Sequence, residues 1–302
     1  MGHRHHSTPT GRHRGRLAFA LGITMTVLAV EVAGGLITGS LALFADAGHM
    51  ATDAAGLGLS LLAAHFATRP ATTARTFGYA RAEILAATGN ALLLSAVGVF
   101  ILAEGIRRLV DPPAVQPRLV VVFGVIALAG SATSALLLGR GRAESLNVRG
   151  AFIEVVSDAL GAAAVIVSGA VIALTGFTRA DAIASLAIGA FILPRTWRLL
   201  REAIDVLLEA APKGVDLDEV RRHLTEVDGV ADVHDLHAWT ITSGLPVLSA
   251  HVVVETSVLA GGHGARMLDT LQECLRGHFD VEHSTFQLEP GGHADHEPSV
   301  CL

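Results

Sequence analysis

Long apolar stretches, each about twenty residues or more, fill the chain from residue 17 to residue 200. Short polar segments rich in Arg, Gly, Pro and Ser separate them. A stretch of this length can cross the hydrocarbon core of a bilayer as one helix. We therefore expect six membrane-spanning helices, at Leu17–Ile37, Leu41–Phe66, Ala82–Leu109, Leu119–Leu138, Gly150–Leu174 and Asp181–Leu200.

The pattern changes after Pro212, where apolar and polar residues mix at shorter spacing. Leu217, Val220, Leu224 and Val227 recur at helical spacing, which predicts an amphipathic helix. The order that follows is helix, strand, strand, helix, strand, which favours a two-layer domain with helices on one face of an antiparallel sheet. The predicted elements are Asp216–Val227, Ala231–Thr240, Pro246–Glu255, Gly264–Phe279 and Glu282–Leu288.

The predicted fold class is thus an α-helical membrane protein, a six-helix transmembrane bundle followed by a small cytoplasmic α+β domain. Its parts are a disordered tail rich in His and Arg at residues 1–16, the bundle at 17–208, the α+β domain at 209–290 and a disordered tail at 291–302. The tail histidines, His3, His5, His6 and His13, either gather metal loosely or belong to a solvated basic tail.

Arginine predicts the orientation in the membrane. The N-terminal tail, the segments after the second and fourth spans and the end of the sixth span carry most of the arginines near the membrane. By the positive-inside rule, both termini lie in the cytoplasm. These arginines are Arg4, Arg12, Arg14, Arg16, Arg69, Arg75, Arg81, Arg140, Arg142, Arg149, Arg195, Arg198 and Arg201.

Composition supports the membrane class, because 51% of the 302 residues are hydrophobic and only 17% are charged. The net charge is −6, and no basic stripe indicates a nucleic-acid partner. Cys274 and Cys301 are too few and too far apart for a disulfide framework or a CxxC metal site.

Two of the apolar stretches carry paired ionisable residues. His49 and Asp53 are four residues apart in the second stretch, and Glu154 and Asp158 are four apart in the fifth. Residues at this spacing share one face of a helix. Ionisable groups inside a membrane are costly and usually face the bundle interior, where they bind or relay something. Two such pairs can offer four ligands to one ion, the number that a tetrahedral zinc-like site requires.

Several segments resemble the cation diffusion facilitators, a family that exports zinc and related divalent cations. Residues 40–53, SLALFADAGHMATD, are similar to the family's second helix, and residues 147–161, NVRGAFIEVVSDALG, to its fifth. Residues 77–84, FGYARAEI, resemble the entry to its third helix, and residues 233–240, VHDLHAWT, the first strand of its cytoplasmic domain. The resemblance implies a metallochaperone-like αββαβ cytoplasmic domain, a homodimer and proton-coupled antiport.

By this resemblance, His49, Asp53 and Asp158 match the ligands of the transport site. Zinc-transporting members usually carry His at the fourth position, where this chain has Glu154. Three carboxylates and one imidazole form a harder ligand set, which shifts preference toward Mn²⁺ or Co²⁺ without excluding zinc. We expect Zn²⁺ as the leading substrate, with Co²⁺, Cd²⁺, Ni²⁺ and Mn²⁺ as alternatives, and no organic cofactor.

In the cytoplasmic domain, His234, His251 and Glu289 match a regulatory metal site of the family at the domain's dimer interface. The alternative is that these strand histidines are only hydrogen-bonded structure. Further candidate ligands are His263, His283 and, in the membrane, Asp46, while Gln287 would be a poor one. We also expect Asp181 to favour the N-terminus of its own helix.

Other functional classes fit less well. An intramembrane metalloprotease would need HExxH, which the sequence lacks, so we expect a transporter and no enzyme. A haem protein would want paired histidines across helices, and the spans contain only His49 and His65. A passive channel with an acidic ring is the remaining alternative to a carrier.

Overall fold

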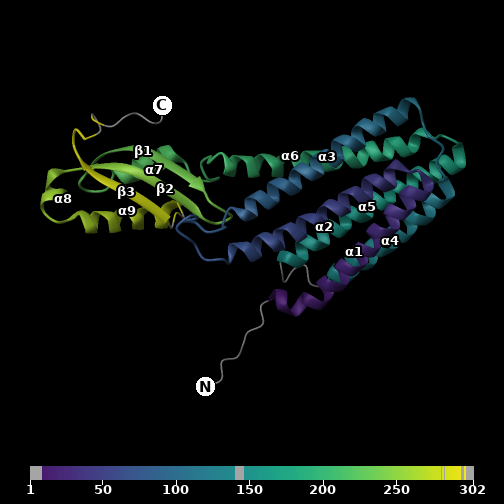
Figure 1. The fold of residues 1–302 in the computed structure, drawn as a ribbon, viewed down its shortest axis with the longest axis horizontal. Coiled ribbons are helices and arrows are strands. Elements are labelled where there is room, and N and C mark those ends of the chain that lie inside the picture. The colour runs from purple at the N-terminus through teal and green to yellow at the C-terminus, as the bar shows by residue number, and fades with distance from the viewer. Residues whose placement is uncertain (1–8, 140–145, 280, 282, 294–295, 297–302) are drawn as a thin grey trace, which may run out of the picture. The chain divides into compact units, whose positions relative to one another are not determined.

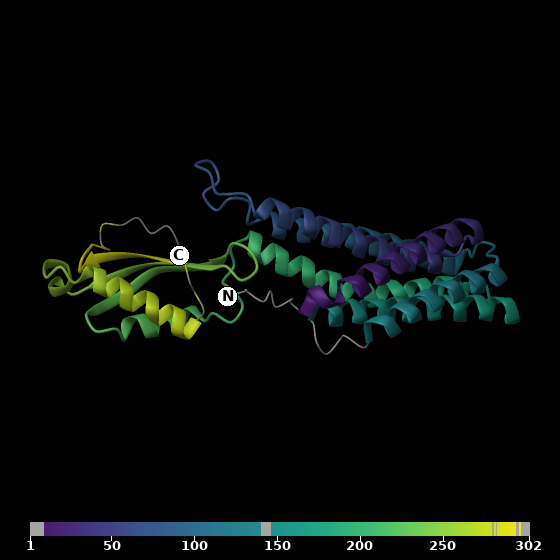
Figure 2. The same cartoon turned by 90° about the horizontal axis from the view of Figure 1, so that it is seen from below.

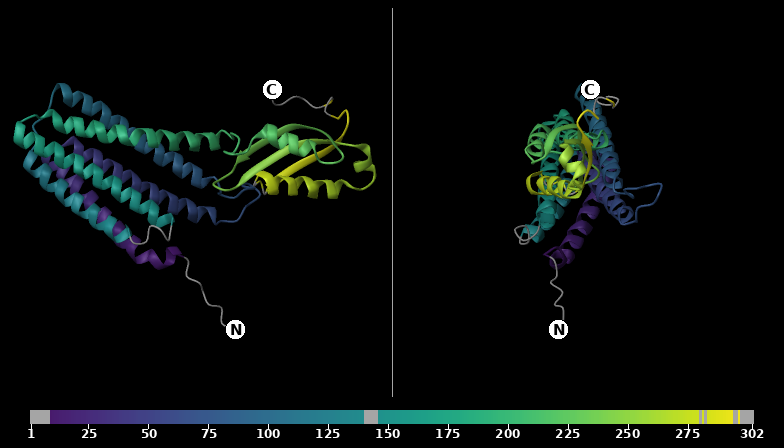
Figure 3. Two further views of the ribbon diagram at one scale, coloured as in Figure 1. Left: turned by 180° about the vertical axis from the view of Figure 1, so that it is seen from behind. Right: turned by 90° about the vertical axis from the view of Figure 1, so that its left-hand side faces the viewer.

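The computed structural model describes residues 9–139, 146–279, 281, 283–293 and 296. The chain divides into two compact units, residues 1–61 with 89–200 and residues 62–88 with 201–302. Six long helices come first and run alongside one another (Figure 1 and Figure 3). They are α1 (Pro9–Thr38), α2 (Leu41–Ala67), α3 (Ala82–Val110), α4 (Pro117–Gly139), α5 (Leu146–Thr175) and α6 (Arg179–Leu207).

Among the described residues, five of these helices are long and apolar enough to cross a membrane: α1 from Leu17, α3, α4, α5 from Val148, and α6. The remaining helix, α2, has 27 residues and is therefore long enough. The six predicted spans correspond to these six helices.

The start of α1 differs from the prediction. The helix begins at Pro9, so residues 9–16 are helical, whereas we predicted disorder up to residue 16. Proline is tolerated at the first position of a helix, and Arg is a good helix former, so the helix extends into the polar segment. The predicted disorder of residues 1–8 and of most of the C-terminal tail lies outside the described residues.

Glycines let the helices approach closely, as the small residues predict. A Cβ atom on Gly34 of α1 would lie 2.7 Å from the Phe123 ring of α4. A Cβ atom on Gly105 of α3 would lie 2.8 Å from the side chain of Leu186 on α6. Both contacts are shorter than side chains accept, so only glycine permits the observed packing of these helix pairs.

Asp181 lies in the first turn of its own helix, α6, as we expected, and its carboxylate also caps α2. Its Oδ2 atom accepts a hydrogen bond from the Leu41 amide at 2.7 Å, and its Oδ1 atom accepts one from the Ser40 hydroxyl at 2.5 Å. Both donors belong to the N-terminus of α2, where the helix dipole favours a carboxylate. Arg108 of α3 lies 4.0 Å from Asp181 and donates to the Gly39 carbonyl at 2.6 Å. The three helices α2, α3 and α6 are therefore joined at one end.

The C-terminal domain contains a three-stranded sheet in the order β1-β2-β3 (Figure 1). Val220 and Leu224 of α7 and Leu271 and Leu275 of α9 pack on one face of the sheet. Figure 2 shows α9 running along this face. The elements are α7 (Leu217–Thr225), β1 (Val230–Thr240), β2 (Pro246–Val254), α8 (Thr256–Ala260), α9 (Gly264–Phe279) and β3 (His283–Pro290).

One part of the predicted sheet is wrong. The strands β1 and β2 pair antiparallel as expected, but β2 and β3 pair parallel, so the sheet is mixed. The reason is the helix α9, which carries the chain back along the sheet before β3 begins, as the crossover between parallel strands requires. The short helix α8 was not predicted either.

Candidate metal centres

The first centre lies between α2 and α5. One ligand atom from each of His49, Asp53 and Glu154 lies within 4.8 Å of the others. The His49 Nε2 atom is 3.4 Å from Asp53 Oδ2 and 3.7 Å from Glu154 Oε1. One helical turn separates His49 from Asp53, so both reach the same point from α2 while Glu154 reaches it from α5. The structure thus brings together three of the four predicted ligands of the transport site.

These side chains carry polar atoms that make no hydrogen bond within the described part of the chain. They are His49 Nδ1, Asp53 Oδ2 and Glu154 Oε1, each shielded from solvent. Buried polar atoms in proteins are nearly always hydrogen-bonded or bound to an ion. One ligand atom of each side chain lies close to those of the other two, so a single cation bound among them would contact all three side chains.

Asp158, the fourth predicted ligand, does not join this close group. It lies one helical turn beyond Glu154 on α5 and is 3% exposed. Its Oδ1 atom is also buried and makes no hydrogen bond within the described part of the chain. Asp158 is therefore a buried carboxylate beside the group, and reaching the same ion would require its side chain to move.

Asp46, the further candidate in the membrane, faces α5 at a different level. It is 2% exposed, and its carboxylate rests directly against Gly161 of α5. Glu31 of α1 is fully buried, and neither of its carboxylate oxygens accepts a hydrogen bond from a donor among the described residues. Neither acid joins the group of His49, Asp53 and Glu154.

Arg195 is a member of the centre that the sequence did not reveal. From α6, its Nη2 atom donates to Glu154 Oε2 at 3.3 Å. From the sequence, Arg195 indicates only the orientation in the membrane. The available signal was an arginine directly after Pro194, inside the predicted span Asp181–Leu200, because a charged residue within a span usually has a partner.

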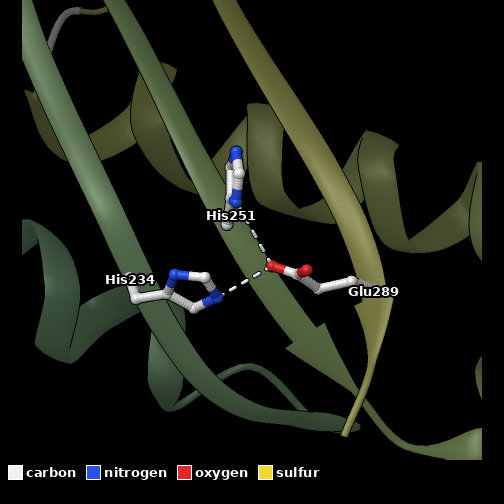
Figure 4. A group of neighbouring side chains, drawn as sticks. All are labelled: His234, His251 and Glu289. Carbon is white, nitrogen blue, oxygen red and sulfur yellow. Dashed lines mark ion pairs between the residues drawn. The ribbon is translucent and has the colours of Figure 1, made fainter. Parts of the chain in front are cut away.

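The second centre lies on the cytoplasmic sheet, where His234 of β1, His251 of β2 and Glu289 of β3 meet (Figure 4). Glu289 Oε1 is 2.8 Å from His234 Nε2 and 3.4 Å from His251 Nδ1. His234 and His251 are directly paired across the two strands. Their neighbours Val233 and Val252 belong to the core, so strand alternation puts the histidines on the face opposite the helices.

Glu289 is only 2% exposed, and together with the two histidines it offers one carboxylate and two imidazoles, which are ligands that zinc accepts. Two further groups lie near the cluster. Asp235 Oδ2 is 3.8 Å from His251 Nε2, and His293 Nε2 is 3.7 Å from Glu289 Oε2. Asp235 has a φ of 49°, at an irregularity in the pairing of β1, and this left-handed conformation is one that Asp tolerates.

Two of the further candidates stand apart from the cytoplasmic cluster. His283 begins β3, pairs with Val247 and makes an edge contact with the Phe77 ring at 6.0 Å. His263 lies between α8 and α9. The described group contains neither of them. The Cys274 thiol is half-buried, and burial together with Glu226 raises its pKa, which disfavours the thiolate that a metal needs.

Comparisons with known proteins cover nearly the whole chain. A family model described as the cation efflux transmembrane domain matches residues 17–208, and one described as the cytoplasmic domain of cation efflux proteins matches residues 212–291. The metal cation efflux system protein CzcD of Cupriavidus metallidurans is 44% identical over 284 residues, covering 94% of this chain and 89% of that protein.

Two further relatives have similar coverage. Zinc transporter ZitB of Escherichia coli is 39% identical over 295 residues, covering 96% of this chain and 93% of ZitB. The cadmium, cobalt and zinc/H(+)-K(+) antiporter of Bacillus subtilis is 32% identical over 303 residues, covering 100% of this chain and 96% of that protein.

Proposed function

Since this chain belongs to the cation diffusion facilitator family, we propose that it is a proton-coupled antiporter that exports divalent transition-metal cations from the cytoplasm. Zn²⁺ is the leading substrate, and Co²⁺, Cd²⁺, Ni²⁺ and Mn²⁺ are the alternatives. The observation that carries the proposal is the group of His49, Asp53 and Glu154 between two membrane helices, in which His49 is buried and the two acids are partly buried. The names of the relatives, which include zinc, cadmium and cobalt, agree with this range.

Four residues form the proposed transport site: His49, Asp53, Glu154 and Asp158. The first three already lie within reach of one ion. Asp158 would complete a four-coordinate site by a side-chain rotation over the turn that separates it from Glu154. The ion is the substrate of this site, so the site must also release it.

Proton coupling follows from the chemistry of the ligands. A metal binds to carboxylates and to neutral imidazole, so protons and metal compete for the same lone pairs. Protons entering from a more acidic side would displace the ion, and metal arriving from the cytoplasm would displace the protons. Alternating access then requires α2 and α5 to expose the site to each side in turn.

We further propose that His234, His251 and Glu289 bind a regulatory metal ion and that the protein is a homodimer. Metal at this cluster would stabilise one arrangement of the cytoplasmic domains and so report the cytoplasmic metal concentration to the transporter. The proposed setting is the cell's cytoplasmic membrane with both termini in the cytoplasm, which the arginine distribution supports.

The proposal is tested with purified protein in liposomes that enclose a zinc-sensitive dye. We expect saturable zinc uptake that rises with an imposed pH gradient and is lost in Asp53→Ala. Zinc flux that is linear in concentration and indifferent to the pH gradient would favour the passive channel. Full pH-driven flux in Asp53→Ala would remove the site assignment.

A further inference from the structure

Arg195 contacts one ligand of the proposed transport site and gives the two oxygens of that ligand different roles. The Oε1 atom of Glu154 points to His49, with 3.7 Å between Oε1 and Nε2. The Oε2 atom accepts a hydrogen bond from Arg195 Nη2 at 3.3 Å. Hydrogen bonding follows the same division, since Oε1 is a buried atom that makes no hydrogen bond within the described part of the chain.

The charges around the site also depend on this arginine. With metal bound, Asp53, Glu154 and Asp158 are ionised and His49 is neutral, so the ligands carry three negative charges. A divalent ion would leave one negative charge uncompensated at membrane depth, which is costly. The guanidinium is always protonated, and its positive charge, on a side chain that is 54% exposed at the edge of the site, offsets the remaining negative charge.

We propose that Arg195 is a specificity-determining residue: by occupying Glu154 Oε2, it restricts Glu154 to one metal-ligating oxygen and favours four-coordinate ions such as Zn²⁺. This inference rests on the proposed transport function. Ions that prefer six oxygen-rich ligands, such as Mn²⁺, benefit from a second carboxylate oxygen. Because Arg195 occupies that oxygen, it opposes the shift toward Mn²⁺ that three carboxylate ligands would otherwise cause.

The test compares the zinc and manganese dissociation constants of the full-length protein in detergent, measured by competition with a chromogenic chelator. Every variant also carries Glu289→Ala, so that the cytoplasmic cluster does not contribute. We expect Arg195→Gln to lower the preference for zinc over manganese about tenfold, the effect of one additional favourable ligand contact. Arg195→Lys keeps the charge and a donor and should stay near the parent.

The ratio of the two constants separates specificity from damage to the fold, since both ions carry the same charge and a destabilised site would weaken both. In the Glu154→His background there is no carboxylate for the arginine to occupy, so adding Arg195→Gln should leave the ratio unchanged. The matched control is Arg198→Gln, on the next turn of α6, which should also leave it unchanged.

An unchanged ratio in Arg195→Gln, or an equal shift in the Glu154→His background, would overturn the inference. Asp53→Ala distinguishes this failure from failure of the transport site itself. Loss of zinc binding in Asp53→Ala beside an unchanged ratio in Arg195→Gln rejects only the role of Arg195. Wild-type zinc affinity in Asp53→Ala rejects the transport site and this inference together.

Discussion

Asp181 caps the helix that begins at Leu41, although 140 residues separate them. The carboxylate is 2% exposed, and both of its oxygens accept hydrogen bonds from the start of α2. From Leu41, about 12 Å of helix lead to His49 at 1.5 Å per residue. The cap therefore fixes the depth and rotation of the helix that presents the metal ligands.

Replacing Asp181 with Ala should leave buried donors without acceptors and lower the free energy of unfolding by about 1–3 kcal/mol. It should also weaken zinc binding at the transport site, because α2 loses its fixed position. Thermal unfolding and zinc titration in detergent measure the two effects. The control is Asp216→Ala, which removes the N-cap of α7 at a cost of about 1 kcal/mol and should not change zinc affinity at this site. Equal losses of affinity in both variants would contradict this role.

Gly161 provides a second test of the packing between α2 and α5. A Cβ atom at this position would overlap the Asp46 carboxylate, with its Cγ only 2.8 Å away. Gly161→Ala should push α2 away from α5 and destabilise the protein by about 1–3 kcal/mol through overpacking. Zinc flux in liposomes should fall with it.

The matched control for Gly161 is Gly150→Ala on the same helix, because nothing lies within 4 Å of a Cβ atom there. Alanine is the better helix former, so this variant should be as stable as the parent or more stable. Equal stability and equal zinc flux in Gly161→Ala and Gly150→Ala would show that the close contact between Gly161 and Asp46 is not needed for folding or transport.

If His234, His251 and Glu289 bind zinc, removing one of them should change the number of zinc ions bound per protomer. Removing the buried acid with Glu289→Ala should lower the zinc bound per protomer by one ion, because both histidines lose their shared partner. Elemental analysis after gel filtration in zinc-buffered detergent measures this number. His283→Ala is the control, since His283 contacts Phe77 instead of the cluster. An unchanged zinc content in Glu289→Ala would show that the cluster does not hold metal.

Helix positions were the easiest feature to predict from the sequence. The ends of α2 and α3 lie within one residue of the predicted ends, because hydrophobic length and flanking arginines determine where a span begins and ends. The pairing of β2 with β3 was harder. Alternation predicts which face of a strand is buried, but strand direction depends on where the intervening helix returns the chain.

In the candidate centres too, some features follow from the sequence and others depend on how the helices pack. The spacing of His49 and Asp53 puts them on one face. The resemblance to the family suggested His234, His251 and Glu289. The contacts of Arg195 and Asp181 depend on how α6 packs against α5 and α2, which no local pattern encodes. For the same reason, the sequence could not predict that Asp158 lies outside the close group while Glu154 lies inside it.

The most direct test of the account is the number of zinc ions held by the membrane domain. Full-length protein carrying Glu289→Ala is equilibrated with buffered zinc in detergent, and bound zinc is counted with and without Asp53→Ala. Ligands pooled from α2 and α5 predict one bound ion per protomer in the first protein and none in the second. One zinc ion per protomer in both would contradict the claim that His49, Asp53 and Glu154 together hold the transported metal.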